Sequence, residues 1–262
     1  MPHPFAISPA RLARLIGTPD APVVVDVRLP DDLTRLPRVI PGSVVVPHTD
    51  IAQLNPTRAV VACMGGRKLS EGVAAILRTK GVAAEILDGG TLAWAEHGLP
   101  MIPLQALPKT HVWVTRHRPK IDRIACPWLV RRWIDPQAQF LYVAPSEVLE
   151  VAKRFDALPF DVEGCDFSHE GPRCTFDILL DRFALHTPAL DRLATVIRGA
   201  DTDDHALSPQ AAGLLALSVG LSKMFRDDLA QLEAGMLIYD ALYRWARDGF
   251  DEGHDWPAGR GA

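Results

Sequence analysis

The 262-residue sequence predicts an α/β domain followed by a mainly α-helical domain. In the first hundred residues, short apolar runs alternate with helical segments, an order typical of a parallel sheet flanked by helices. In the second half, apolar residues recur at helical spacing in several long segments. A proline-rich stretch separates these two patterns. Together they predict two domains of different class.

The β-branched run at residues 23–27 predicts a buried parallel strand, the apolar run at 59–62 predicts the strand before Cys63, and residues 84–87 predict a further strand. Residues 71–80 carry apolar side chains at helical spacing, and Gly81 ends this predicted helix. A shorter helix is predicted to follow the glycine pair at 89–90. This alternation justifies the α/β class of the first half.

The most direct indication of chemistry is Cys63, which follows the apolar run 59–62 and precedes a glycine-containing loop. A strand, a loop and a helix start can surround one sulfur with backbone N–H groups. Such a cradle lowers a thiol pKa and stabilises an anionic adduct. An inert buried cysteine is the alternative. The predicted catalytic residues are Cys63, Arg67 and Lys68, and the loop also contains Met64, Gly65, Gly66 and Leu69.

Four motifs resemble the rhodanese homology domain over about residues 5–103. They are Val24-Val25-Asp26-Val27-Arg28, Ile40-Pro41-Gly42-Ser43, Cys63-x-x-Gly66, and Leu87-Asp88-Gly89-Gly90 with Ala93-Trp94. The resemblance implies a thiosulfate or persulfide sulfurtransferase, in which Cys63 carries sulfane sulfur as a persulfide. It implies a small-molecule or protein persulfide donor, a thiol acceptor and no required cofactor. It also implies that Asp26 and Arg28 support the site by tying strand to loop.

Loop length separates sulfur transfer from phosphatase chemistry. Rhodanese-type sulfurtransferases close a six-residue loop with a basic residue, and the sixth position here is Lys68. A seven-residue phosphatase-type loop would need arginine at the position of Leu69. Lysine offers a point charge where arginine, the more usual residue, offers a rigid fork. We therefore expect sulfurtransferase chemistry with weak activity toward a standard donor.

Three prolines in residues 100–108 predict an extended connection. The predicted organisation is therefore a domain at 1–103, a linker at 104–110, a domain at 111–250 and a flexible tail at 251–262. The four cysteines form no CxxC pattern, residues 1–17 show no basic segment followed by an apolar run of 7 to 15 residues, and no apolar run approaches 18 residues. These observations predict a cytoplasmic protein without membrane association.

Five segments of the second half have helical spacing, at residues 124–134, 146–155, 175–183, 188–198 and 209–221. A sixth and longest helix is predicted over residues 221–246, because apolar side chains recur there at steps of three and four. We expect this apolar stripe to lie in the core. Its members are Leu221, Phe225, Leu229, Leu232, Met236, Tyr239 and Tyr243.

The second half resembles the C-terminal domain of the chromate-resistance protein ChrB over about residues 110–248. The segments that carry the resemblance are 113–116, 120–129, 167–169, 173–177, 198–202, 226–228 and 233–236. The resemblance implies a link to chromate resistance, and the alternative function is a non-catalytic chromate or oxyanion sensor or operon regulator. DNA is an unlikely partner, because the first half departs from the ChrB regulator and the second half carries 18 basic against 23 acidic residues.

A basic segment opens this acidic half: residues 116–132 contain six basic residues and only one acidic residue, Asp122. Lys120, Arg123 and Arg131 are the predicted ligands of an oxyanion such as chromate or sulfate, because charge-assisted donors bind tetrahedral anions. A helix beginning near residue 124 would add its N-terminus to the site. Ion pairs with the surplus carboxylates are the alternative interpretation.

A divalent metal is a further prediction for the second half. Several candidate ligands lie in the ChrB-like segments, although their spacing matches no established metal motif. The predicted ligands are His169, Asp201 and Glu233, and this donor set favours a hard or borderline ion over one bound by thiolates. Cys126 and Cys165 are not expected to take part in chemistry.

Overall fold

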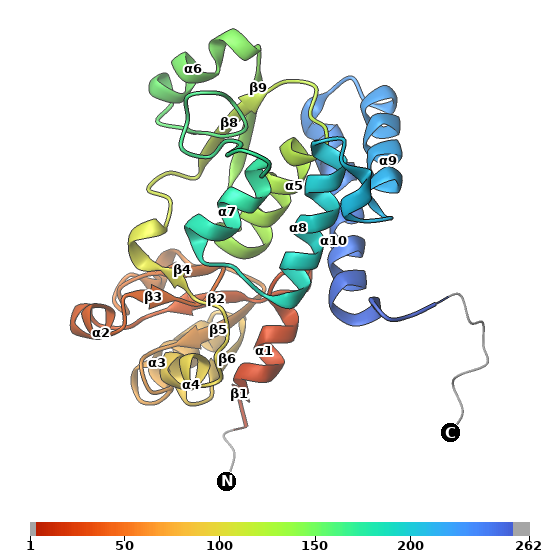
Figure 1. Ribbon diagram of the computed structural model, residues 1–262. Helices are drawn as coiled ribbons and strands as arrows, with labels where there is room; N and C mark the ends of the chain where they lie inside the picture. The colour runs from red at the N-terminus through yellow and green to blue at the C-terminus, as the bar shows by residue number, and fades with distance from the viewer. Residues whose placement is uncertain (1–3, 254–262) are drawn as a thin grey trace.

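The computed structural model describes residues 4–253, and its first half is built on a five-stranded parallel sheet (Figure 1). The strand order is β1-β6-β5-β2-β4, so β5, which leads to Cys63, is the central strand. A two-stranded antiparallel pair of β3 and β7 lies outside this sheet. The strands are β1 (Ala6–Ile7), β2 (Val23–Asp26), β3 (Arg38–Val39), β4 (Ser43–Val45), β5 (Arg58–Ala62), β6 (Ala83–Leu87) and β7 (Ile102–Pro103).

Successive side chains of the central strands enter different clusters on the two faces of the sheet, as the two-residue period of a strand requires. Val24 and Val60 enter the large core cluster, whereas Val25, Val61 and Cys63 enter a second cluster with α3. This confirms the α/β class predicted for the first half. Its helices are α1 (Pro9–Leu15), α2 (Pro30–Arg35), α3 (Leu69–Thr79) and α4 (Gly90–Glu96), with a 3-10 turn at Ile51–Gln53.

The second half is mainly helical, as predicted, but it also contains a three-stranded parallel sheet of order β10-β8-β9. The sequence analysis missed these strands, which are β8 (Val112–Arg116), β9 (Gln139–Val143) and β10 (Leu158–Pro159). The central strand β8 buries Trp113 and Val114 in two different clusters, so both of its faces are covered. A strand of this kind lacks the alternation of apolar and polar residues that identifies a half-exposed strand.

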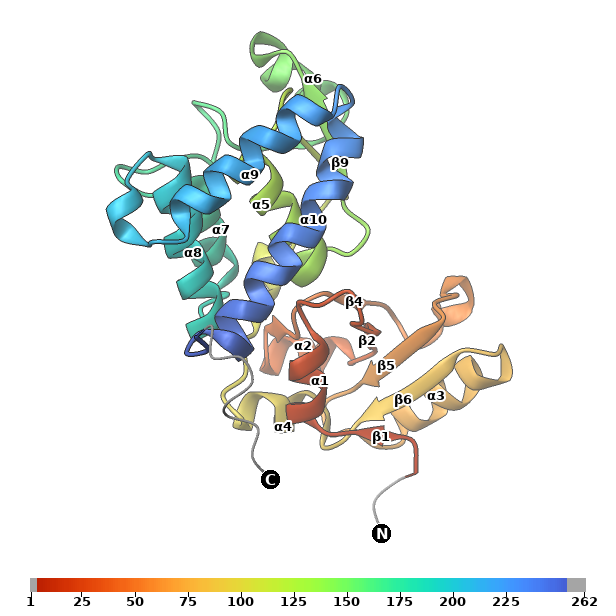
Figure 2. The ribbon, with the colours of Figure 1, turned by 90° about the vertical axis from the view of Figure 1, so that its right-hand side faces the viewer.

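Helix α5 (Asp122–Leu129) lies at the centre of the second half, where it contacts α7, α8 and α10 (Figure 2). A π-helical turn, Val130–Ile134, continues α5 after Pro127. The surrounding helices are α6 (Val148–Arg154), α7 (Thr175–Phe183), α8 (Pro188–Asp201), α9 (Ala211–Met224) and α10 (Asp228–Arg244). Shorter turns are Leu104–Ala106, Pro145–Glu147, His205–Leu207 and the π-helical turn Trp245–Gly249.

The single helix predicted over residues 221–246 is wrong, because the chain breaks between α9 and α10. Asp227 caps the new helix, its carboxylate accepting a hydrogen bond of 2.7 Å from the amide of Ala230. The apolar stripe is therefore buried only in its second part, from Leu232 to Tyr243, whereas Leu229 is 48% exposed. A local capping interaction thus interrupts a periodicity that continues in the sequence.

One hydrophobic core joins the two halves. The same buried cluster contains Ile16 and Trp94 from the first half and Trp133 and Tyr243 from the second. The predicted linker contributes as well, because Leu104–Ala106 forms a 3-10 turn with side chains packed against this cluster. The domain bounds stay predictions, and most of the predicted tail, residues 254–262, lies outside the described residues.

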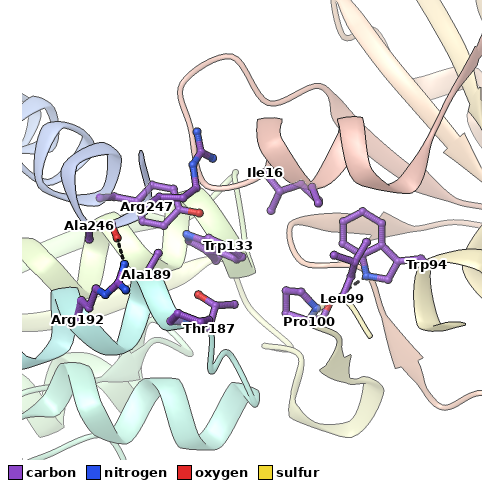
Figure 3. A pocket seen from close by; sticks show the side chains of 13 residues that line it. Ile16, Trp94, Leu99, Pro100, Trp133, Thr187, Ala189, Arg192, Ala246 and Arg247 are labelled. Carbon is purple, nitrogen blue, oxygen red and sulfur yellow. Dashed lines mark hydrogen bonds between the residues drawn. The ribbon is translucent and has the colours of Figure 1, made fainter. Parts of the chain in front are cut away.

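An apolar pocket of about 290 Å³ lies at this junction (Figure 3). Ile16, Trp94 and Pro100 face it from the first half, and Trp133 and Arg192 line it from the second. The loop around Cys63 is not part of its lining. Among residues 4–253, no helix is long and apolar enough to cross a membrane.

Candidate functional site

Cys63 lies directly after β5, at the carboxyl end of the central strand, and α3 begins six residues later at Leu69. Two amides at the start of α4 hold the loop: Thr91 donates to the carbonyl of Cys63 at 3.0 Å, and Leu92 donates to the carbonyl of Met64 at 3.1 Å. The carboxyl edge of a parallel sheet is the usual position of a site in open α/β folds. The predicted strand, loop and helix arrangement is therefore present.

Glycine is required at two points where the loop meets the start of α4. Gly66 has a φ of +67°, and a Cβ added there would lie 2.5 Å from the carbonyl oxygen of Leu87. Gly90 also has a positive φ, and its added Cβ would collide with the carbonyl oxygen of Cys63. Only glycine combines such backbone angles with so close an approach. The two glycine motifs in the sequence thus form one packed contact.

The thiol of Cys63 is 6% exposed and has two oxygen neighbours. Its Sγ lies 3.3 Å from the carbonyl oxygen of Arg67 and 3.3 Å from Oγ of Ser70. Ser70 is fully buried in the first turn of α3. A hydroxyl can rotate to accept from a thiol or donate to a thiolate. The sequence analysis did not assign a role to Ser70.

The Cys63 loop opens into a cavity of about 590 Å³. The exposed side chains of Arg67 and Lys68 line it, and Asp32 and Glu96 lie on the same wall. Lys68 has a φ of 34°, a left-handed conformation that is uncommon for a residue with a side chain. The cavity therefore offers two cations beside a nearly buried sulfur.

Asp26 and Arg28 form a buried ion pair that fixes the chain beside the Cys63 strand. The guanidinium donates to the Asp26 carboxylate, at 2.6 Å for the shortest contact, and to the carbonyls of Leu36 and Arg38 at 2.9 and 2.7 Å. The amide of Val27 donates to the carbonyl of Ala62, the residue before Cys63. The pair has the supporting position that the resemblance implied.

Ser70→Ala is expected to slow reactions of the Cys63 thiolate by about 10- to 100-fold, because a hydrogen bond to a charged group contributes about 1.5–3 kcal/mol. Alkylation rates of Cys63 measured at one fixed pH test this expectation. Ser43→Ala is the matched control, since Ser43 is also buried but its hydroxyl has no partner within the described chain. Equal alkylation rates in the two variants would contradict a role for Ser70.

The other three cysteines lie in the second half and are free. Burial raises the pKa of the Cys126 thiol well above its ordinary value and also raises the pKa of Cys174. Cys174 caps α7 together with Asp177, and partial burial raises the pKa of Cys165. Because the thiolate is the nucleophile, none of these thiols is prepared for attack at neutral pH.

The predicted oxyanion ligands are engaged in contacts within the protein. Arg123 lies 3.3 Å from a carboxylate oxygen of Asp161, and Arg131 pairs with Glu233 and covers the ring of Phe140. Lys120 is exposed. For Arg123 and Arg131 the structure therefore agrees with the alternative interpretation of the basic segment, internal ion pairs.

Two of the three predicted metal ligands come together, and the third does not. His169 Nε2 lies 3.2 Å from an Asp201 carboxylate oxygen, whereas Glu233 is on α10 and pairs with Arg131. The prediction of Glu233 is therefore corrected: Asp122 takes the third position beside His169 and Asp201. Asp161 also approaches His169, at 3.4 Å. Sequence analysis assigned neither Asp122 nor Asp161 to the site.

The electrostatics of this cluster are unusual for side chains of these types. Burial raises the pKa of Asp122 to about 7, although His169 acts against this shift. The neighbouring carboxylates of Asp122, Asp161 and Asp201 raise the pKa of His169 to about 12. Burial opposes ionisation of Asp161, but His169 and Arg116 outweigh it and its pKa is lowered. The cluster therefore concentrates negative charge around one imidazole.

Residues 113–246 match the family model described as "ChrB, C-terminal domain", which covers half of the chain and includes the whole of this cluster. The chain belongs to the ChrB C-terminal domain family. Protein ChrB of Cupriavidus metallidurans (strain ATCC 43123 / DSM 2839 / NBRC 102507 / CH34) is 36% identical over 132 residues, which are 50% of this chain and 39% of that protein. The chain thus spans well under half the length of this ChrB relative.

Solved structures are similar to about a third of the chain. One is a rhodanese-related protein from Thermoplasma volcanium, with 25% identity, coverage of 37% of this chain and 96% of that chain, and a TM-score of 0.32. Another is thiosulfate sulfurtransferase from Pseudomonas aeruginosa, with 29% identity, coverage of 38% and 19%, and a TM-score of 0.32. The expected ChrB C-terminal domain is confirmed.

Proposed function

We propose that the protein is a sulfurtransferase that carries sulfane sulfur as a persulfide on Cys63. The observation that supports this proposal most strongly is the position of Cys63. Its sulfur lies at the carboxyl end of the central strand, beside a cavity of about 590 Å³ lined by Arg67 and Lys68. Arg67 and Lys68 can donate charge-assisted hydrogen bonds to an anionic sulfur donor such as thiosulfate, although Asp32 and Glu96 belong to the same lining.

The proposed reaction has two displacement steps. The Cys63 thiolate attacks the outer sulfur of thiosulfate, a new S–S bond forms, and sulfite leaves with the electron pair of the broken S–S bond. An acceptor thiolate then attacks the outer sulfur of the Cys63 persulfide. The persulfide bond breaks, and its electron pair returns to Cys63 as thiolate. No further oxidant or reductant is needed.

Other contacts in the loop support this role. The hydroxyl of Ser70, 3.3 Å from the sulfur, can donate to the thiolate and to the inner sulfur of the persulfide. Gly66 and Gly90 approach each other's backbone closely and so hold the Cys63 loop against the start of α4. Among the four thiols, Cys126 and Cys174 are buried, with raised pKa values, and unsuited to exchange.

The test is intact-mass measurement after incubation with thiosulfate or with a low-molecular-weight persulfide. The wild-type chain should gain one sulfur, about 32 Da, and a thiol reductant should remove it. Cys63→Ser should gain nothing. Cys165→Ser is the control, since Cys165 is the one of the four cysteines that is not buried. An unchanged adduct in Cys63→Ser, or no adduct in the wild type with either donor, would overturn the proposal.

The ChrB C-terminal domain gives this transfer a proposed setting, chromate stress. Chromate consumes cellular thiols and competes with sulfate, so a persulfide carrier would be useful under these conditions. Chromate tolerance of cells that produce the wild-type chain, compared with cells that produce Cys63→Ser, tests this link. Equal tolerance would separate the sulfur chemistry from chromate resistance.

A further inference from the structure

The strongest feature outside the Cys63 site is the cluster of His169 with Asp122, Asp161 and Asp201. These residues come from four separate parts of the second half. Asp122 begins α5, Asp161 follows β10, His169 lies in the loop before α7, and Asp201 ends α8. One donor atom from each of Asp122, His169 and Asp201 can be chosen so that all three lie within 4.8 Å of one another. Such convergence of N and O donors needs a physical reason.

Hydrogen bonding alone does not account for the arrangement. Three carboxylate oxygens face the same nitrogen, His169 Nε2, at 3.2 Å for Asp201 and 3.4 Å for both Asp122 and Asp161. One ring nitrogen carries at most one hydrogen, and charge-assisted N–H···O bonds have lengths of about 2.7–2.9 Å. All three contacts are longer than that.

His186 provides an internal comparison. It also lies between two aspartates, but each ring nitrogen meets one carboxylate, Asp191 at 3.0 Å and Asp181 at 2.9 Å. Arg173 further neutralises Asp181. His186 therefore shows ordinary ion pairing between imidazole and aspartate. At His169, by contrast, three carboxylates face one ring nitrogen, and the N···O distances are longer than those at His186.

The separations at His169 match the edges of a metal coordination sphere. With metal–ligand distances of about 2.0–2.2 Å, adjacent donors in a tetrahedral or octahedral site lie about 2.8–3.6 Å apart. The observed 3.2 and 3.4 Å fall within that range. The distances from His169 Nε2 to the two carboxylates are thus those expected of ligands around a common cation.

Charge supports a cation at this position. Within the described residues, neither Asp122 nor Asp201 forms an ion pair with an arginine or lysine, and His169 is the ionic partner of both. The helix N-termini compensate in part, because Asp122 accepts hydrogen bonds from the amides of Thr175 and Phe176 at the start of α7. These bonds also orient the Asp122 carboxylate, and each of its oxygens keeps a further lone pair.

Asp161 has a different place in the cluster. Its Oδ1 faces His169, whereas its Oδ2 lies 2.8 Å from Arg116 and 3.3 Å from Arg123. Two arginines therefore neutralise this carboxylate and hold it beside the imidazole. Asp161, whose Oδ1 also accepts a hydrogen bond from the hydroxyl of Thr175 at 3.3 Å, is thus a neutralised carboxylate beside the site rather than a third carboxylate ligand.

We propose that His169 Nε2, Asp122 Oδ2 and Asp201 Oδ2 bind one divalent first-row transition-metal ion of the Mn²⁺, Fe²⁺ or Zn²⁺ class. A donor set of one imidazole and two carboxylates suits these ions and not a soft ion bound by thiolates. The Asp122 side chain is 1% exposed and that of His169 is 39% exposed. The site is therefore closed at Asp122 and open at His169, where water or an added ligand completes the coordination.

The experiment uses the full chain, treated with a chelator and titrated separately with Mn²⁺ and Zn²⁺ by calorimetry. The wild type should bind one ion, and His169→Ala and Asp201→Asn should lose this stoichiometric binding. Asp161→Asn should weaken it by less than about 10-fold, because Arg116 and Arg123 already neutralise the carboxylate that this substitution removes. Asp122 is left unchanged, because its carboxylate also caps α7.

His186→Asn is the matched control and should bind as the wild type does. Circular dichroism of each variant separates loss of a ligand from loss of fold. Co²⁺ gives a second readout, since its visible spectrum should lack the charge-transfer band of thiolate coordination. Absence of binding in the wild type, equal binding by His169→Ala, or a thiolate band would each overturn the proposal.

Discussion

Replacement of Arg28 by alanine is expected to lower the free energy of unfolding by about 3–5 kcal/mol, the loss typical of a broken buried ion pair. The substitution leaves the buried Asp26 carboxylate without its cation. It also removes the donors to the carbonyls of Leu36 and Arg38, which join the end of β2 to the chain before β3. Urea denaturation of the full chain measures the loss.

Two further variants make this prediction specific. Arg38→Ala removes an exposed arginine on the neighbouring β3 and should change the unfolding free energy by less than about 0.5 kcal/mol. Arg28→Lys keeps a positive charge, but an ammonium group lacks the planar fork with which the guanidinium reaches one carboxylate and two carbonyls. We therefore expect an intermediate loss of unfolding free energy. Similar stability of Arg28→Ala and Arg38→Ala would show that the buried pair contributes little.

The first half of the fold follows closely from the sequence, because local signals agree there with the tertiary structure. The apolar run 59–62 corresponds to β5 (Arg58–Ala62), and the predicted helix at 71–80 corresponds to α3 (Leu69–Thr79). Glycine at 81 and at 89–90 marks real chain reversals. In the second half, β8 and the break at Asp227 depend on burial and capping, which periodicity alone does not encode.

The two candidate sites also differ in how far they could be predicted from the sequence. Cys63 could be predicted because its loop is continuous in the sequence. The cluster at His169 could be predicted only in part, since its members are separated by whole secondary-structure elements. In the sequence, Asp122 is the one acidic residue of a basic segment. In the structure, its carboxylate accepts a hydrogen bond from the amide of Thr175, 53 residues further along the chain. Glu233 does not join the cluster, because its position on α10 brings its carboxylate to Arg131.

The shared core leads to the second large prediction, that Trp133→Ala lowers the free energy of unfolding by about 3–5 kcal/mol. Trp133 is buried in the second half, packs edge-on against Tyr243 at a centroid distance of 5.7 Å, and also faces Gly17 of the first half. Its removal enlarges the pocket at the junction. The wild-type chain should unfold in one calorimetric transition, with equal calorimetric and van't Hoff enthalpies.

Substitution from either side tests whether Trp133 couples the halves. Trp133→Phe keeps an aromatic ring and removes an indole N–H that has no hydrogen-bond partner in the described chain, so its cost should be smaller. Gly17→Ala acts from the first half: Gly17 has a φ of +80°, and an added Cβ would lie 2.5 Å from the Trp133 ring. We expect it to cost about 1–3 kcal/mol through overpacking. Two resolved transitions in the wild type, or no loss in Gly17→Ala, would mean that the halves fold independently despite their common core.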